Sequence, residues 1–147
     1  MCAAASDTRE DPYRKMLRLQ EEAAEWEVKA HRSLLEARKL ETKAARLSLK
    51  ASQMAGKAEA QVARSRSIES QAVGMLHEEQ AADKDLKVEK ARQLGHEAES
   101  LRYRAKAVES QAEQLRITAR AKIAESARFL EDAKARMREA EATKGLL

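Results

Sequence analysis

The stretch ARKLETKAARLSLKASQMAGKA (37–58) decides the fold. Alanine recurs in it every seven residues, and a larger apolar side chain follows each of the first three alanines by three residues. The alanines are Ala37, Ala44, Ala51 and Ala58, and the larger residues are Leu40, Leu47 and Met54. Side chains spaced three and four residues apart lie on one side of an α-helix. The stretch therefore predicts a helix with a narrow apolar seam.

The same seven-residue repeat extends through most of the chain. Small residues alternating with larger ones over many heptads are typical of a coiled coil. The predicted coiled-coil seam consists of Ala23, Trp26, Ala30, Ala37, Leu40, Ala44, Leu47, Ala51, Met54, Ala91, Leu94, Ala98, Leu101, Val108 and Leu115. Towards the C-terminus the large apolar residues shift by four positions, to Ile123, Leu130 and Met137. This shift predicts a stutter near 119–123, which would locally unwind the supercoil.

The composition supports a long helix rather than a globular domain. Of the 147 residues, 37% are charged and only 3% are aromatic, so a thick apolar core cannot form. A high charge content also marks disordered chains. Proline occurs once and asparagine never, however, and the apolar residues keep a strict period. The sequence predicts an all-α coiled-coil protein.

Residues that typically start or end a helix lie at the two ends of the chain. Asp11 can accept a hydrogen bond from the first turn, and Pro12 fits the first helical position. Lys144 followed by Gly145 predicts a cationic last turn and a left-handed residue after it. We expect a flexible N-terminal tail over 1–10 and a C-terminal end over 145–147.

The middle of the chain leaves two arrangements open. The seam registers before and after 77–87 do not connect, which predicts a register break or hinge between coiled-coil segments at 11–76 and 88–144. No Gly, Pro or Asn lies between 77 and 90, which favours a continuous or gently broken rod. The similar lengths of the two segments fit the alternative, an antiparallel helical hairpin that breaks at about 77–87.

A basic block covers 28–67, with ten basic and three acidic side chains, giving +7 within a chain of net charge +4. The block predicts a partner-binding basic face formed by Lys29, Arg32, Arg38, Lys39, Lys43, Arg46, Lys50, Lys57, Arg64 and Arg66. Its partner would be an acidic protein surface such as a microtubule. An anionic membrane fits less well, because the apolar side is mostly alanine. Nucleic acid fits least, because the block has no aromatic residue for base stacking.

The sequence offers no constellation for catalysis or for a metal. His77-Glu78 and His96-Glu97 lack the second histidine, four residues on, that a zinc site of this kind needs. The single cysteine, Cys2, cannot form an intrachain disulfide. We therefore expect a protein that is not an enzyme and uses no cofactor. The first residues have no basic leader region and no apolar run spans a membrane, so we expect a cytoplasmic, including cytoskeletal, location.

Two stretches carry a family resemblance. EDPYRKMLRLQEE (10–22) and EAAEWEVKAHRSLL (22–35) resemble parts of the first long helix of the phage-shock-protein A and ESCRT-III superfamily. The resemblance implies a helical hairpin that assembles into filaments and remodels anionic membranes. From the residues themselves we expect a structural scaffold subunit of a larger assembly, self- or hetero-oligomeric, that packs through its seam and docks its basic face on an acidic protein. A peripheral membrane-remodelling protein is the alternative.

Overall fold

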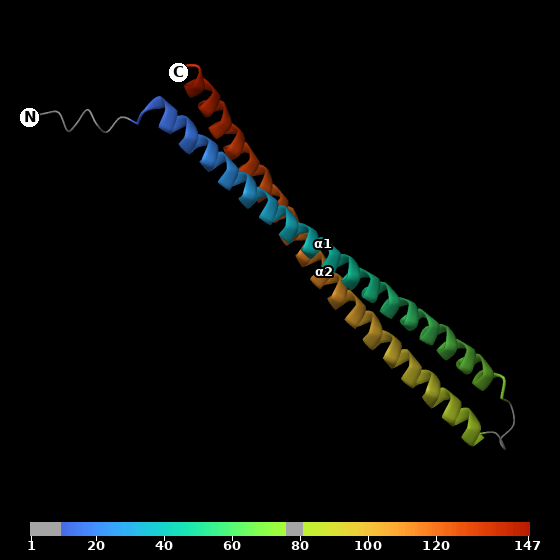
Figure 1. Cartoon of the computed structure of the whole chain (residues 1–147). Coiled ribbons are helices and arrows are strands. Elements are labelled where there is room, and N and C mark those ends of the chain that lie inside the picture. Colours follow the sequence, from blue (N-terminus) through green and yellow to red (C-terminus); the bar gives the residue numbers. More distant parts are fainter. Residues whose placement is uncertain (1–9, 76–80) are drawn as a thin grey trace, which may run out of the picture. The chain divides into compact units, whose positions relative to one another are not determined.

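Two long helices account for almost all of the structure, a computed structural model that describes residues 10–75 and 81–147. Helix α1 (Pro12–Val73) has 62 residues and helix α2 (Ala81–Lys144) has 64 (Figure 1). The all-α prediction is confirmed. Within the described residues, neither helix carries an apolar stretch that could cross a membrane.

Helix α1 begins where the sequence predicts. Pro12 is its first residue, and the backbone N–H of Tyr13 lies 3.4 Å from the Oδ1 of Asp11, which accepts its hydrogen bond. The Asp11 carbonyl accepts the first helical bond, from the Lys15 N–H at 2.9 Å. Asp11 is therefore the N-cap. Arg18 adds to this end by donating to Glu10 at 2.9 Å and to Glu22 at 2.8 Å.

The helix ends differ from the expectations. Gly74, which the heptad pattern placed inside a helix, directly follows α1, and its N–H donates to the Ser70 carbonyl at 3.1 Å. Gly145 is not left-handed, because no glycine in the described residues has a positive φ. The last residues continue the helical turn instead, with Gly145 N–H bonded to the Glu141 carbonyl at 3.1 Å.

The break between the helices precedes most of the segment 77–87. Helix α2 begins at Ala81, so residues 81–87 are helical where the register suggested a hinge. Asp83 lies in the first turn of α2, where its carboxylate complements the positive end of the helix dipole. The remainder of the expected break, at 77–80, and residues 1–9 of the expected tail lie outside the described residues.

The chain divides into two compact units, each made of one part of α1 and one part of α2. Unit 1 comprises Met1–Glu41 and Ile117–Leu147, and unit 2 comprises Thr42–Arg116. Within each unit, the two helix segments are antiparallel, because the residue numbers of contacting pairs change in opposite directions. The pairs are Lys15–Glu139, Glu22–Arg136 and Glu36–Lys122 in unit 1, and Ser48–Glu109, Gln61–Glu97 and Gln71–Lys87 in unit 2. This pairing within the units is what the hairpin alternative predicts.

Alanine dominates the core of both units. Apart from Leu19, every buried apolar residue in the part of the chain that the structure describes is an alanine. Each buried methyl-sized group contributes about 0.8 kcal/mol, so such a seam stabilises the helix pair only modestly. The small side chains allow the two backbones to approach closely instead.

The predicted stutter near 119–123 is wrong. After Ala119 the buried row continues in steps of seven, through Ser126, Ala133 and Ala140. Ile123, Leu130 and Met137, which would form the shifted seam, are 40%, 40% and 39% exposed. The small residues can seat against the facing helix at close range and the large ones cannot. The seven-residue register therefore prevails over side-chain size.

Candidate interaction surface

The predicted seam residues fall into two classes of burial. The alanines Ala23, Ala30, Ala37, Ala44, Ala51, Ala91 and Ala98 are buried. The larger residues Trp26, Leu40, Leu47, Met54, Leu94, Leu101, Val108 and Leu115 are half-buried. The small residues therefore form the contact line between helices, and the larger ones cover its side.

Two serines in the buried row tie the helices together. Ser65 Oγ donates to the Ala91 carbonyl at 2.8 Å in unit 2, and Ser126 Oγ donates to the Ala30 carbonyl at 2.9 Å in unit 1. A hydroxyl can reach a carbonyl of the opposite backbone only where the helices lie close together. These bonds also fix the register. Sequence reasoning missed Ser126, although the count in sevens from Ala119 could have found it.

Trp26 lies beside the seam of unit 1, where three other side chains contact its ring. Its ring lies against that of Phe129, with centroids 5.4 Å apart. The Lys29 ammonium lies 4.3 Å from the centre of the Trp26 ring, and the Arg136 guanidinium lies 5.8 Å from it. Both distances suit a cation–π interaction. Lys29, which belongs to the predicted basic face, thus contacts an aromatic ring of its own helix while remaining exposed.

The structure exposes all ten residues of the predicted basic face and brings some of them into one row. Lys43, Lys50, Lys57 and Arg64 each directly precede a residue of the buried row, Ala44, Ala51, Ala58 and Ser65. They therefore follow one side of α1 at a spacing of about 10.5 Å, since seven residues rise 1.5 Å each. Arg46 lies on the same side of the helix. Arg38 and Arg66 directly follow a buried residue and lie on the other side.

Helix α2 adds two cations to this row. Because Ser65 bonds to Ala91, the residues before them, Arg64 and Lys90, flank the seam on the same side. Ala51 and Ala105 share the lining of one hollow, which likewise places Lys50 and Arg104 together. The basic edge of unit 2 is therefore defined by Lys43, Arg46, Lys50, Lys57, Arg64, Lys90 and Arg104. Sequence reasoning missed Lys90 and Arg104, because only the register between the helices reveals them.

The cations of the basic edge are not paired with carboxylates of the described residues. Within the described residues, none of its seven side chains makes an ion pair. Along the same edge α2 places the carboxylate of Glu97, which lies 3.4 Å from the Gln61 Nε2. Unit 1 differs, because Lys15, Lys122 and Arg136 pair with carboxylates of the facing helix at 3.2 to 3.4 Å. The seven cations of the basic edge therefore differ from those of unit 1 in making no ion pair with a described residue.

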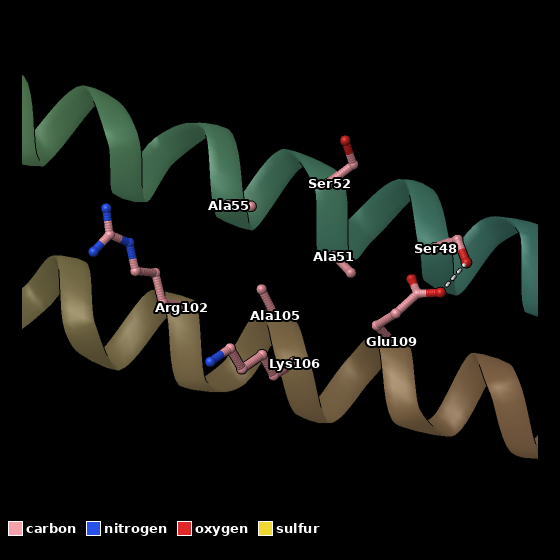
Figure 2. Close-up of a pocket in the computed structure, with 8 residues that line it drawn as sticks. All are labelled: Ser48, Ala51, Ser52, Ala55, Arg102, Ala105, Lys106 and Glu109. Carbon is pink, nitrogen blue, oxygen red and sulfur yellow. Dashed lines mark hydrogen bonds between the residues drawn. The ribbon is translucent and has the colours of Figure 1, made fainter.

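The opposite edge of unit 2 carries both basic and acidic side chains and holds a hollow of about 340 Å³ (Figure 2). Ala51, Ala55 and Ala105 line it, with Arg102 and Lys106 of α2 beside them. Ser48 and Ser52 of α1 and Glu109 of α2 also line it, and Ser48 and Glu109 bond to each other. Among the described residues, no group of His, Cys, Asp and Glu could hold a metal ion. We assign no ligand to this hollow.

A hydrogen-bonded cluster closes one end of this hollow. Arg116 Nη1 donates to Glu109 Oε1 at 3.0 Å, Ser48 Oγ donates to the same oxygen at 3.2 Å, and Arg116 Nη2 donates to Ser48 Oγ. The Ser48–Glu109 bond is visible in Figure 2. The hydrogen bonds from Arg116 and then Ser48 lower the pKa of the Glu109 carboxyl below its usual value. Arg116 also pairs with Glu113 at 3.2 Å, and the bond between Ser48 and Glu109 joins the two helices.

Comparison with known proteins adds no family. The sequence matches no protein family, no curated protein and no solved structure. A functional proposal therefore depends on the surfaces themselves.

Proposed function

We propose that the chain is a non-enzymatic scaffold subunit of a larger assembly, such as one of the cytoskeleton, and that it docks through the basic edge of unit 2 on an acidic protein surface. The observation that carries this proposal is the row of exposed cations at seven-residue spacing, which makes no ion pair with any residue that the structure describes. Such a row creates a local positive potential that attracts an anionic partner and is screened by salt.

An acidic protein suits this edge better than an anionic membrane does. The row is linear and about 10.5 Å from one cation to the next along α1, a spacing that a partner helix with carboxylates every seven residues can match. The seam beside it is alanine, so the edge offers little apolar surface for insertion into lipid. The membrane-remodelling alternative rests on the resemblance of residues 10–35 to the phage-shock-protein A and ESCRT-III superfamily.

Charge reversal with a matched control tests the proposal. The edge variant carries Lys50→Glu, Lys57→Glu and Arg64→Glu. The control variant carries Arg66→Glu, Arg102→Glu and Lys106→Glu, which change the net charge equally at exposed positions on the other side of unit 2. Both should remain as helical as the natural chain by circular dichroism, because none of the six side chains makes an ion pair within the described residues.

Binding is then measured in two assays at near-physiological salt. Tagged full-length chains are purified from their own cells, and co-purifying proteins are quantified by mass spectrometry. We expect acidic proteins in constant ratio with the natural chain and the control, and their loss with the edge variant. Co-sedimentation with microtubules provides a defined acidic lattice. Equal loss with both variants would show that only overall charge matters.

Binding to vesicles that contain phosphatidylserine distinguishes the membrane-remodelling alternative from the scaffold proposal. Salt-sensitive binding of the natural chain to such vesicles, without any protein partner lost in the edge variant, would replace the scaffold proposal with the membrane one. No binding to vesicles, with protein partners present, would support the scaffold.

A further inference from the structure

Helix α2 carries a second apolar row in unit 1, formed by Ile123, Leu130 and Met137. These residues are spaced by seven and are each about two-fifths exposed. The neighbouring row of small residues faces α1, so α1 leaves the larger row open. We name these three residues the outer stripe.

The outer stripe borders a hollow of about 360 Å³. Leu130, Ala133 and Met137 provide its apolar lining, and the charged side chains around it are Glu27 of α1 and Lys134 and Arg138 of α2. One wall is therefore acidic and the other basic. Within the described residues, Glu27 and Arg138 make no ion pair, and Lys134 pairs with Glu131 of its own helix at 3.7 Å.

The spacing of the outer stripe identifies a helix as the partner. Its side chains repeat every 10.5 Å or so, which is the spacing at which another helix with a seven-residue repeat can insert its own side chains. An extended peptide, with alternate side chains about 7 Å apart, would not match this spacing. The partner must also present a basic flank to Glu27 and an acidic flank to Lys134 and Arg138.

We propose that a second copy of this chain covers the outer stripe, through a two-fold axis that runs parallel to the helices of unit 1. This operation places each α1 against α2 of the partner, so α1 of the partner covers each outer stripe and both stripes point towards the axis. It brings Glu27 towards Lys134 and Arg138 of the partner subunit, and the reverse contact forms on the other side of the axis. Dimers with such a self-complementary interface are the commonest oligomers.

The alternative two-fold axis, perpendicular to the helices, fits less well. It would place α1 against α1 and α2 against α2. Glu27 would then approach its own counterpart, and Lys134 and Arg138 would approach theirs. Like charges placed together oppose association, so the charge pattern favours the parallel axis.

Sedimentation equilibrium of the full-length chain tests whether the outer stripe is the dimer interface. The stripe variant carries Leu130→Glu and Met137→Glu, and its control carries Val28→Glu and Leu35→Glu. The control residues also lie in unit 1 at seven-residue spacing, and they are 50% and 56% exposed. We expect the natural chain and the control to be dimers, and the dimer Kd of the stripe variant to rise about 100-fold or more, since like charges would meet in the interface.

Two charge variants test the orientation through their homodimers, which the perpendicular axis would leave no weaker than that of the natural chain, and this test does not depend on the stripe variant folding. One variant carries Glu27→Lys, and the other carries Lys134→Glu with Arg138→Glu. Each alone places like charges together and should dimerise at least about tenfold more weakly. An equimolar mixture should restore a heterodimer, because both contacts then join opposite charges.

Three results would overturn the proposal. They are a natural chain that stays monomeric at every concentration, a stripe variant that remains helical and dimerises normally, and a mixture of the two charge variants that does not associate. The docking of the basic edge on a protein partner is unaffected by any of them, because that edge belongs to unit 2.

Discussion

Ala98 has none of its surface exposed, and neither does Ala58 of the facing helix in unit 2. The bond from Ser65 to Ala91 places these two alanines opposite each other, because Ala58 lies seven residues before Ser65 and Ala98 lies seven residues after Ala91 in an antiparallel pair. The contact between the helices at this level is therefore methyl to methyl. A larger side chain on either helix would have to push the backbones apart.

The substitution Ala98→Leu should therefore destabilise the chain. Overpacking of a close contact typically costs about 1–3 kcal/mol. Ala107→Leu is the control, because Ala107 lies in the same helix and is exposed, and changes at such positions usually stay within about 0.5 kcal/mol. Urea unfolding followed by circular dichroism measures both. Equal stability of the two variants would contradict the close approach at Ala98.

The sequence predicted which alanines form the seam but not which hydroxyl meets which carbonyl. Periodicity reports the side of a helix on which a residue lies and carries no information about the facing helix. Ser126 was missed for a related reason, because the larger Ile123 and Leu130 suggested a shifted register. Apolar size indicated a core there, whereas close backbone contact selected the small residues.

Each helix contains an interior glycine whose presence no contact explains. Gly56 lies within α1 and Gly95 within α2, and a Cβ added at either position would have no other atom within 4 Å, apart from the neighbouring residues and the nearby backbone of the same helix. Neither has a positive φ. The flexibility of glycine therefore weakens both helices without serving a turn.

Replacing these glycines should stabilise the fold. Gly56→Ala and Gly95→Ala should each raise the free energy of unfolding by about 1 kcal/mol, because alanine restricts the unfolded chain and favours the helix. Ala60→Gly, at an exposed position of α1, should lower it by a similar amount. Thermal unfolding of the three variants gives the comparison. A loss of stability in either alanine variant would reveal a constraint on the backbone at that glycine.

At the level of elements, the start of α1 was more predictable than its end. Asp11 and Pro12 set the start of the helix through contacts with neighbouring residues, so the sequence alone reveals their role. Gly74 also follows a regular heptad pattern, and the pattern alone does not show whether such a glycine continues a helix or ends it. The choice between rod and hairpin needed contacts between segments that are far apart in the sequence, such as Ser65 with Ala91.

Across the molecule, charge is unevenly neutralised. The sequence predicted a basic block at 28–67, and within it the structure distinguishes Lys29, held over Trp26, from the unpaired row on unit 2. The contribution of Lys90 and Arg104 depends on the register between helices. Composition could therefore indicate the sign of the partner's charge, whereas the shape of the binding edge required the fold.

The charge pattern predicts that the fold is sensitive to acid. Hydrogen bonds lower the pKa of two carboxyls below its usual range, that of Glu10 through Arg18 and that of Glu109 through Arg116 and Ser48. A carboxyl whose pKa is lower in the folded state contributes stability above its unfolded pKa and loses that contribution as the pH falls through the folded value. Below pH 4.5, 29 lysines and arginines and 3 histidines also repel one another without compensating carboxylates.

We therefore expect the free energy of unfolding to be steady between pH 7 and pH 5 and to fall steeply below pH 4.5. Urea unfolding at low salt measures this, and added salt at pH 3 should restore part of the helicity by screening the repulsion. Glu109→Gln should weaken the dependence on pH, because its amide keeps the shape of the carboxyl but does not titrate. Equal stability at pH 3 and pH 7 would mean that the hydrogen bonds of Glu10 and Glu109 and the repulsion among the cations contribute nothing measurable to the stability of the fold.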